Sequence, residues 1–547
     1  MNPYLAPWFG CFNSMTGYLV GTLFFAASLT PSLIPRTPLT QGLVSGISMA
    51  AGYGLGVAAL RLWSYLELPV PGRRARSRIM LGIPVACVAV ATLALWQASE
   101  WQRDVMLLMK LEPPESSRPF KMSAVALLVF SALIMLGRFF RWVAHTVARP
   151  LKSFLPRRVS YVLGFTSAFI LFWLLFSGLV FRVALRLADA SYQQIDAMQE
   201  EGFEEPGEAL KTGSAASLIS WNTLGRAGRQ FVSAGPSRED IARFLGTEAL
   251  QPIRVYVGLN SAETIRDRAL LALGELKRVG AFERSVLVIV TPTGTGWIDP
   301  AAMDPLEYLH GGDIASVAMQ YSYLPSWLTL LVEPAYGARS ARELFMVVYD
   351  HWTKLPVDGR PRLYLFGLSL GALNSDLSVD LFDVVADPFQ GALWAGPPFN
   401  SRTWRSATQD RVPGSPAWLP RFRDSSVIRF TNQDDVLDVP GARWGPLRIV
   451  YLQYASDPIT FFDPRTFYRR PDWLAEPLGP DVSRKFRWFP VVTMLQLAVD
   501  MMAGTTAPIG YGHLFAPEHY IHAWVHVTNA QWSPEDLARL KSHCSHR

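Results

Sequence analysis

Apolar and charged positions are unevenly distributed along this chain of 547 residues. Before about residue 185 the sequence contains long runs with almost no charge. Each run approaches the roughly 20 apolar residues that a helix needs to cross a bilayer. The runs cover residues 17–34, 41–60, 79–96, 122–136 and 159–183. We therefore predict a transmembrane domain of about five helices over residues 1–185.

Basic residues between these runs predict the topology. Arginine and lysine cluster after the second and fourth runs, whereas the segment after the third run mixes basic and acidic residues. The positive-inside rule then places the second and fourth loops in the cytoplasm. With five spans, the N-terminus is cytoplasmic and everything after residue 185 is extracytoplasmic, which predicts a multi-pass protein of a bacterial-type inner membrane. The same clusters account for much of the net charge of +6, so we expect no nucleic-acid partner.

From residue 252 onward, short apolar runs alternate with amphipathic stretches. The runs at 253–257, 285–290, 315–320, 363–367, 392–395, 427–430 and 448–452 have the length and composition of buried strands. Strands that alternate with helices predict a mostly parallel sheet covered by helices on both faces. We assign residues 251–547 to this α/β domain and residues 186–250 to a linker beside the membrane. The linker contains a glycine-rich segment at 224–229, but it lacks the preceding strand and the Lys-Ser/Thr pair of a phosphate-binding loop.

The strand at 363–367 leads directly into the most informative motif of the chain. Gly367-Leu368-Ser369-Leu370-Gly371 follows the Gly-x-Ser-x-Gly pattern between a strand and a helix, which is typical of the nucleophile elbow of α/β-hydrolases. The glycines permit a tight turn, and the serine hydroxyl is left exposed at the start of a helix. We therefore predict Ser369 to be a nucleophile, the alternative being an ordinary turn with a capping serine.

A nucleophilic serine needs a histidine base, which follows it in the chain order of this fold. His513 lies in a glycine-flanked loop after an apolar helical run and is the predicted base. His519, His522 and His526 share a helical stretch with Trp524, and we interpret them as surface or packing residues. The chain shows no complete set of metal ligands, so we predict no metal and no cofactor.

The acid that orients the histidine should follow a strand. Asp457 comes just after the strand at 448–452 and is the predicted acid. Asp434 and Asp435 follow the strand at 427–430 and remain alternatives, and each aspartate fits an ordinary turn equally well.

Two backbone N–H groups are expected to stabilise the oxyanion. The first is that of Leu370, directly after the nucleophile. The second should come from a loop after an early strand, where Thr293, Gly294 and Thr295 lie in a glycine-containing segment.

Several longer motifs resemble a bacterial family of membrane α/β-hydrolases, whose members join an N-terminal multi-span domain to a hydrolase domain of largely uncharacterised function. The motifs are residues 30–36, 224–229, 291–297, 320–326, 367–371, 451–458 and 512–513. This resemblance covers nearly the whole chain and implies a triad of Ser369, Asp457 and His513. It also leads us to expect an acidic residue before the serine, where this chain has Leu368.

The sequence thus predicts a membrane-anchored serine hydrolase of the esterase or lipase type, acting on an acyl ester of a lipid or of the cell envelope. Two alternatives stay open: an inactive hydrolase fold that serves as an envelope scaffold, and a transport-related membrane protein. The sequence leaves the acyl group, the alcohol, the choice between hydrolysis and acyl transfer, and the oligomeric state undetermined.

Overall fold

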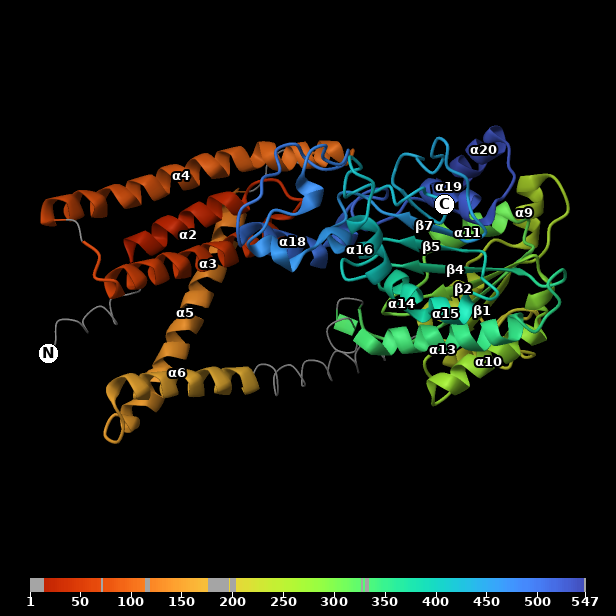
Figure 1. The fold of residues 1–547 in the computed structure, drawn as a ribbon, viewed down its shortest axis with the longest axis horizontal. Coiled ribbons are helices and arrows are strands. Elements are labelled where there is room, and N and C mark those ends of the chain that lie inside the picture. The colour runs from red at the N-terminus through yellow and green to blue at the C-terminus, as the bar shows by residue number, and fades with distance from the viewer. Residues whose placement is uncertain are drawn as a thin grey trace. The chain divides into compact units, whose positions relative to one another are not determined.

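A computed structural model describes residues 14–69, 72–113, 119–175, 196, 203–325, 328–329 and 334–545 of the chain (Figure 1). The chain forms two compact units. The first comprises Met1–Arg186 together with Phe462–Ala507, and the second comprises Leu187–Phe461 together with Pro508–Arg547. The predicted hydrolase range 251–547 is therefore interrupted by a segment that belongs to the N-terminal unit.

The first unit is helical. Its helices are α2 (Met15–Ser28), α3 (Pro38–Tyr65), α4 (Arg73–Leu108), α5 (Pro119–Leu151), α6 (Arg157–Trp173) and, from the later segment, α18 (Val492–Met502). Small residues let these helices approach closely, as in membrane bundles. A Cβ on Gly56 would lie 2.8 Å from the Cα of Gly17 in α2, and a Cβ on Gly46 would lie 2.6 Å from the Ala126 carbonyl oxygen in α5.

Among the described residues, three helices are long and apolar enough to cross a membrane: Pro38–Tyr65, Leu81–Leu108 and Pro119–Leu151. They confirm the second, third and fourth predicted runs. The first run was predicted to reach residue 34, but its helix ends at Ser28 after 14 residues. Pro31 and Pro35 in the following segment cannot continue a helix without losing its hydrogen bonds. The fifth run is helical as far as Trp173, and its end lies outside the described residues.

The second unit is built on a sheet in which all pairs of neighbouring strands are parallel. In the described part of the chain this sheet has seven strands in the order β1-β3-β2-β4-β5-β7-β6. The strands are β1 (Ile253–Val257), β2 (Val286–Thr291), β3 (Ile314–Met319), β4 (Arg362–Leu368), β5 (Gly391–Ala395), β6 (Ile428–Thr431) and β7 (Arg448–Leu452). They are almost entirely buried, because helices cover both faces of a parallel sheet.

Two groups of helices cover the sheet, one on each face (Figure 1). One group contains α10 (Ile265–Arg278), α13 (Pro334–Trp352) and α14 (Leu370–Ser378). The other contains α11 (Pro300–Leu309), α19 (Pro517–Thr528) and α20 (Pro534–Ser545). Shorter helices are α8 (Gly225–Ser233), α9 (Arg238–Leu245), α15 (Leu381–Val384), α16 (Arg402–Gln409) and α17 (Pro458–Phe461). The predicted fold class is confirmed, and helices α8 and α9 occupy part of the range predicted as a linker.

Candidate active site

Ser369 lies in a strained turn between β4 and α14. Its φ of 57° and ψ of −124° are unfavourable for a residue with a Cβ atom, and such strain is concentrated at functional sites. The surrounding contacts require the two glycines of the motif. A Cβ on Gly367 would lie 2.4 Å from the Gly371 carbonyl, and a Cβ on Gly371 would lie 2.2 Å from the Thr291 carbonyl oxygen. The Ser369 N–H donates to the carbonyl of Ala395 at the end of β5, at 2.9 Å, which fixes the turn against the sheet.

His513 is held on a short loop between the η8 turn (Gly504–Thr506) and α19. The N–H of the preceding residue, Gly512, donates to the hydroxyl of Ser456 at 2.9 Å. The imidazole packs against the backbone of Gly396, where an added Cβ would lie 2.6 Å from the ring carbon Cε1. Phe515 contacts the ring edge-on at a centroid distance of 5.8 Å. The side chain is 5% exposed, so its orientation is set by packing.

Asp457 completes the arrangement from the loop after β7. Its Oδ2 atom lies 2.7 Å from His513 Nδ1, and its side chain is 0% exposed. Its Oδ1 atom accepts a hydrogen bond from the Ile459 N–H at 2.8 Å, and the Thr460 hydroxyl donates to Oδ2 at 3.1 Å. These bonds hold the carboxylate in one orientation and compensate for its burial.

The backbone of residues 395 and 396 connects the two halves of this arrangement. Ala395 accepts the hydrogen bond of the Ser369 N–H, and the next residue, Gly396, lies against His513. Ser369 and the Asp457–His513 pair therefore both lie beside the carboxyl end of β5, on the side of the sheet where parallel α/β sheets place their ligands. Within the described part of the chain, His513 Nε2 is buried and has no hydrogen-bond partner. An imidazole that donates from Nδ1 to a carboxylate presents Nε2 as a proton acceptor.

Family comparison agrees with this geometry. A family model described as "Alpha/beta-hydrolase family" matches residues 253–540, which is more than half of the chain. The chain belongs to this family. A second model, described as "Alpha/beta-hydrolase family N-terminus", matches residues 29–236. No curated protein and no solved structure matches the chain.

The alternative acids of this alpha/beta-hydrolase have other partners. Asp435 Oδ2 lies 2.6 Å from Nδ1 of His522, and its Oδ1 lies 3.9 Å from Nε2 of His526. The Asp434 N–H donates to the Asn432 side-chain oxygen at 3.1 Å, whereas His513 Nδ1 faces Asp457. His519 Nδ1 lies 2.5 Å from the Tyr454 hydroxyl, and burial lowers the pKa of His519 to about 4. No group of three potential metal ligands occurs among the described residues.

The predicted oxyanion loop of the hydrolase lies against the elbow, because Thr291 and Pro292 contact Gly371. The Thr293 N–H donates to the Trp297 carbonyl at 3.0 Å, so this N–H belongs to the turn and is a poor oxyanion donor. The loop is held from behind by Tyr256, whose hydroxyl donates to the Gly296 carbonyl at 2.8 Å. Gly296 has a φ of +85°, and a Cβ there would lie 2.5 Å from that hydroxyl.

Sequence reasoning missed two carboxylates of this region. Asp196 caps the glycine-rich segment, with its Oδ1 atom accepting from the Arg226 N–H at 3.1 Å. Its Oδ2 atom accepts from Gln320 Nε2 at 3.3 Å, and burial raises its pKa. The glycine-rich segment therefore donates a hydrogen bond to a carboxylate of the chain itself, that of Asp196, and not to a bound phosphate. Nothing near residue 196 in the sequence signals this contact.

The second missed carboxylate is Asp299, which is 7% exposed and caps α11. Its Oδ2 atom accepts a hydrogen bond from the Tyr520 hydroxyl at 3.1 Å, and its Oδ1 atom accepts from the Ala301 N–H at 3.0 Å. Burial raises its pKa to about 6, and the hydrogen bonds from the Ala301 N–H and the Tyr520 hydroxyl oppose that rise. The capping pattern at residues 299–301 is visible in the sequence, but its position beside the histidine is not.

Proposed function

We propose that this alpha/beta-hydrolase is a membrane-attached serine hydrolase that cleaves a carboxylic acyl ester. The observation that carries the proposal is the buried pair of Asp457 and His513, 2.7 Å apart, beside a serine in a strained elbow. A structural role needs neither the positive φ of Ser369 nor a buried imidazole with an open Nε2 atom.

In the proposed reaction, His513 Nε2 removes the hydroxyl proton of Ser369 as the oxygen attacks the acyl carbonyl. Asp457 keeps the imidazole oriented and stabilises its positive charge. The N–H of Leu370, in the first turn of α14, has no acceptor four residues earlier in that helix and is assigned to the developing oxyanion. We assign the second donor to the segment of Gly294 and Thr295. The alcohol leaves with the proton from Nε2, and water or another acceptor then resolves the acyl-enzyme.

The apolar helices of the first unit favour a substrate that resides in or beside a membrane. Three of its described helices are long and apolar enough to cross a bilayer. A hydrolase attached to such a unit meets lipid and envelope esters at high local concentration. We therefore propose an ester of a lipid or of the cell envelope as the substrate, at an inner membrane and with the hydrolase domain on the extracytoplasmic side.

A fluorophosphonate probe tests the proposal, since it modifies only an activated serine. The full chain in detergent should be labelled and should hydrolyse p-nitrophenyl esters, and Ser369→Ala should abolish both. Ser378→Ala is the matched control, because Ser378 lies in the same helix and its hydroxyl donates to the Ser375 carbonyl. This control should keep normal labelling. Failure to label the wild-type chain, or equal labelling of Ser369→Ala, would overturn the proposal and favour an inactive scaffold.

A further inference from the structure

The segment between the two members of the Asp–His pair belongs to the N-terminal helical unit. The chain leaves the hydrolase unit after Phe461, four residues beyond Asp457, and returns to it at Pro508, five residues before His513. We call Phe462–Ala507 the insert. Its helix α18 packs against α2 and α3 within the N-terminal unit.

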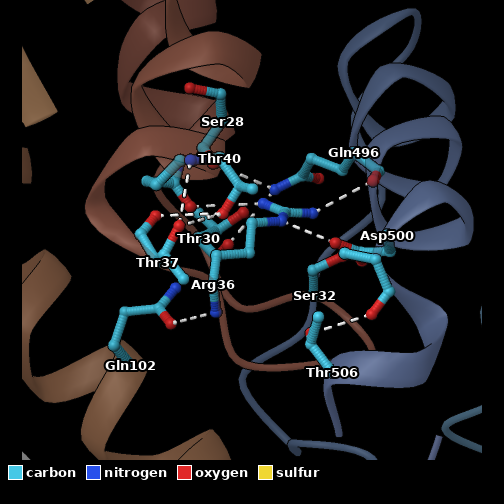
Figure 2. A network of polar contacts seen from close by, with 12 residues as sticks. Ser28, Thr30, Ser32, Arg36, Thr37, Thr40, Gln102, Gln496, Asp500 and Thr506 are labelled. Atoms are coloured by element: carbon cyan, nitrogen blue, oxygen red, sulfur yellow. Dashed lines mark hydrogen bonds and ion pairs between the residues drawn. The ribbon is translucent and has the colours of Figure 1, made fainter. Parts of the chain in front are cut away.

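A buried ion pair fixes the insert in that unit. Arg36 Nε lies 2.6 Å from Oδ1 of Asp500, and the two side chains are 1% and 0% exposed. The Ser32 hydroxyl donates to the other carboxylate oxygen of Asp500 (Figure 2). The Arg36 guanidinium also donates to the Gln496 carbonyl at 3.2 Å and to the Gln41 side chain at 3.3 Å. Hydrogen bonds of this kind compensate for the loss of water around a buried charge pair.

The insert also completes the end of helix α2. The last carbonyl groups of a helix have no partner within that helix. Gln496 Nε2 donates to the carbonyls of Ser28 and Thr30 at 3.1 and 3.2 Å (Figure 2). Gln41 Nε2 also donates to the Ser28 carbonyl, at 2.8 Å. The motif at residues 30–36 plays no part in the proposed hydrolase chemistry. Its contacts with Gln496 and Asp500 instead bind the insert to the N-terminal unit.

We propose that Arg36 and Asp500 form a second attachment of the hydrolase domain to the N-terminal unit, and that they are positioning residues for His513. The first attachment is the covalent linker. The second is the insert, which begins beside Asp457 and ends beside His513, so that its fixation in the helical unit restrains the chain on both sides of the proposed pair. The positioning role rests on the proposed function, whereas the attachment itself does not.

Retention after cleavage tests the attachment without any reference to activity. A protease site is introduced at residues 204–207 of the full chain, which carries an affinity tag at its N-terminus. Because Asp196 stays on the N-terminal fragment and contacts Arg226 and Gln320, all variants also carry Asp196→Ala. After cleavage in mild detergent, the hydrolase fragment should stay on the affinity resin with the N-terminal fragment. Asp500→Asn and Arg36→Gln should each release most of it.

Two controls keep the test falsifiable. Lys485→Met removes the ion pair of the insert with Asp104 in α4, whose side chains are 51% and 34% exposed, and should retain the fragment as the wild type does. The double variant Arg36→Met with Asp500→Leu replaces the buried pair by apolar side chains and should restore retention, because no unpaired charge remains. Release of the wild-type fragment, or full retention of both single variants, would overturn the proposal.

The positioning role has a separate measurement. In the uncleaved protein, Asp500→Asn should lower the rate at which the fluorophosphonate labels Ser369 by about tenfold, since a displacement of about 1 Å costs up to about a hundredfold and a partial displacement costs less. The double apolar variant should recover most of that rate. An unchanged rate in Asp500→Asn would refute positioning and leave the attachment standing. A wild-type chain that is never labelled would refute the proposed function instead.

Discussion

We propose different roles for two buried aspartates of this protein, catalysis for Asp457 and attachment of the insert for Asp500. Each side chain is 0% exposed, and each lies less than 3 Å from a nitrogen of its partner. Asp457 faces His513 in the hydrolase unit, and Asp500 faces Arg36 in the helical unit. The difference lies in the partner. Arg36 is always charged, and its other guanidinium nitrogens donate to Gln41 and Gln496. Each nitrogen of Arg36 therefore has a hydrogen-bond acceptor. His513 keeps Nε2 without a hydrogen-bond partner in the described structure, so its pair leaves one ring nitrogen available.

The same substitution at the two positions should therefore have different effects, and the larger one is on activity. Asp457→Asn should lower kcat roughly 10⁴-fold while the fold persists. The asparagine amide would donate to His513 Nδ1, which forces the proton onto Nε2 and removes the base. The Ile459 N–H would still find an acceptor at position 457. Ester hydrolysis measures the loss of kcat, and the thermal unfolding midpoint shows whether the fold persists. A large loss of stability with unchanged kcat would make Asp457 a structural residue, and its role would then not differ from that of Asp500.

These two aspartates also show what the sequence could and could not predict. Asp457 follows a strand and precedes a proline, and His513 follows a glycine, so local patterns made both of them candidates. The same patterns left Asp434 and Asp435 as alternative acids, and it is the structure that brings Asp457 and His513 together. The sheet was predictable for the same reason, since its strands are short apolar runs between turns. Asp500 carries no such signal. Its partner Arg36 lies 464 residues earlier, and only the packing of α18 on α2 and α3 brings the two side chains together.

The predicted end of the first membrane run was wrong for a related reason. Hydropathy continues from residue 17 to residue 34, but the helix ends at Ser28, since Pro31 and Pro35 follow and Gln496 of the insert donates to the Ser28 and Thr30 carbonyls. Composition cannot show where an apolar segment stops being helical when a distant part of the chain supplies its hydrogen bonds. Asp196 and Asp299 were missed in the same way, since their contacts are with residues far along the chain.

Asp500→Asn is the second test of the comparison, and its main effect should be on stability. It leaves the buried Arg36 charge without its counter-charge, which typically costs about 3–5 kcal/mol of unfolding free energy. Chemical unfolding in detergent, followed by tryptophan fluorescence, measures that loss. Lys485→Met, at the exposed ion pair, serves as the control and should unfold as the wild type does. Comparable unfolding midpoints for the two variants would show that the buried Arg36–Asp500 pair contributes no more to stability than an exposed ion pair does.

Asp299 sharpens the comparison, because it is a buried aspartate without a cation as its hydrogen-bond partner. Its partners are the Tyr520 hydroxyl and the Ala301 N–H, and burial raises its pKa from 3.8 to about 6. A carboxyl group whose pKa is raised on folding is easier to protonate in the folded protein. Its contribution to stability is therefore present at low pH and is lost as the pH rises from about 4 to about 6.

Asp299→Asn removes that loss. The stability of the variant relative to the wild type should be unchanged near pH 4 and should increase by up to about 3 kcal/mol above pH 6, from a shift of about two pKa units at 1.36 kcal/mol each. Unfolding free energies of both proteins between pH 4 and pH 8 measure the difference, and the subtraction cancels the other titrating groups that the two proteins share. A difference that does not increase between pH 4 and pH 6 would mean that Asp299 is already ionised in the fold. The hydrogen bonds from Ala301 and Tyr520 would then outweigh burial, and Asp299 would belong with the two paired aspartates.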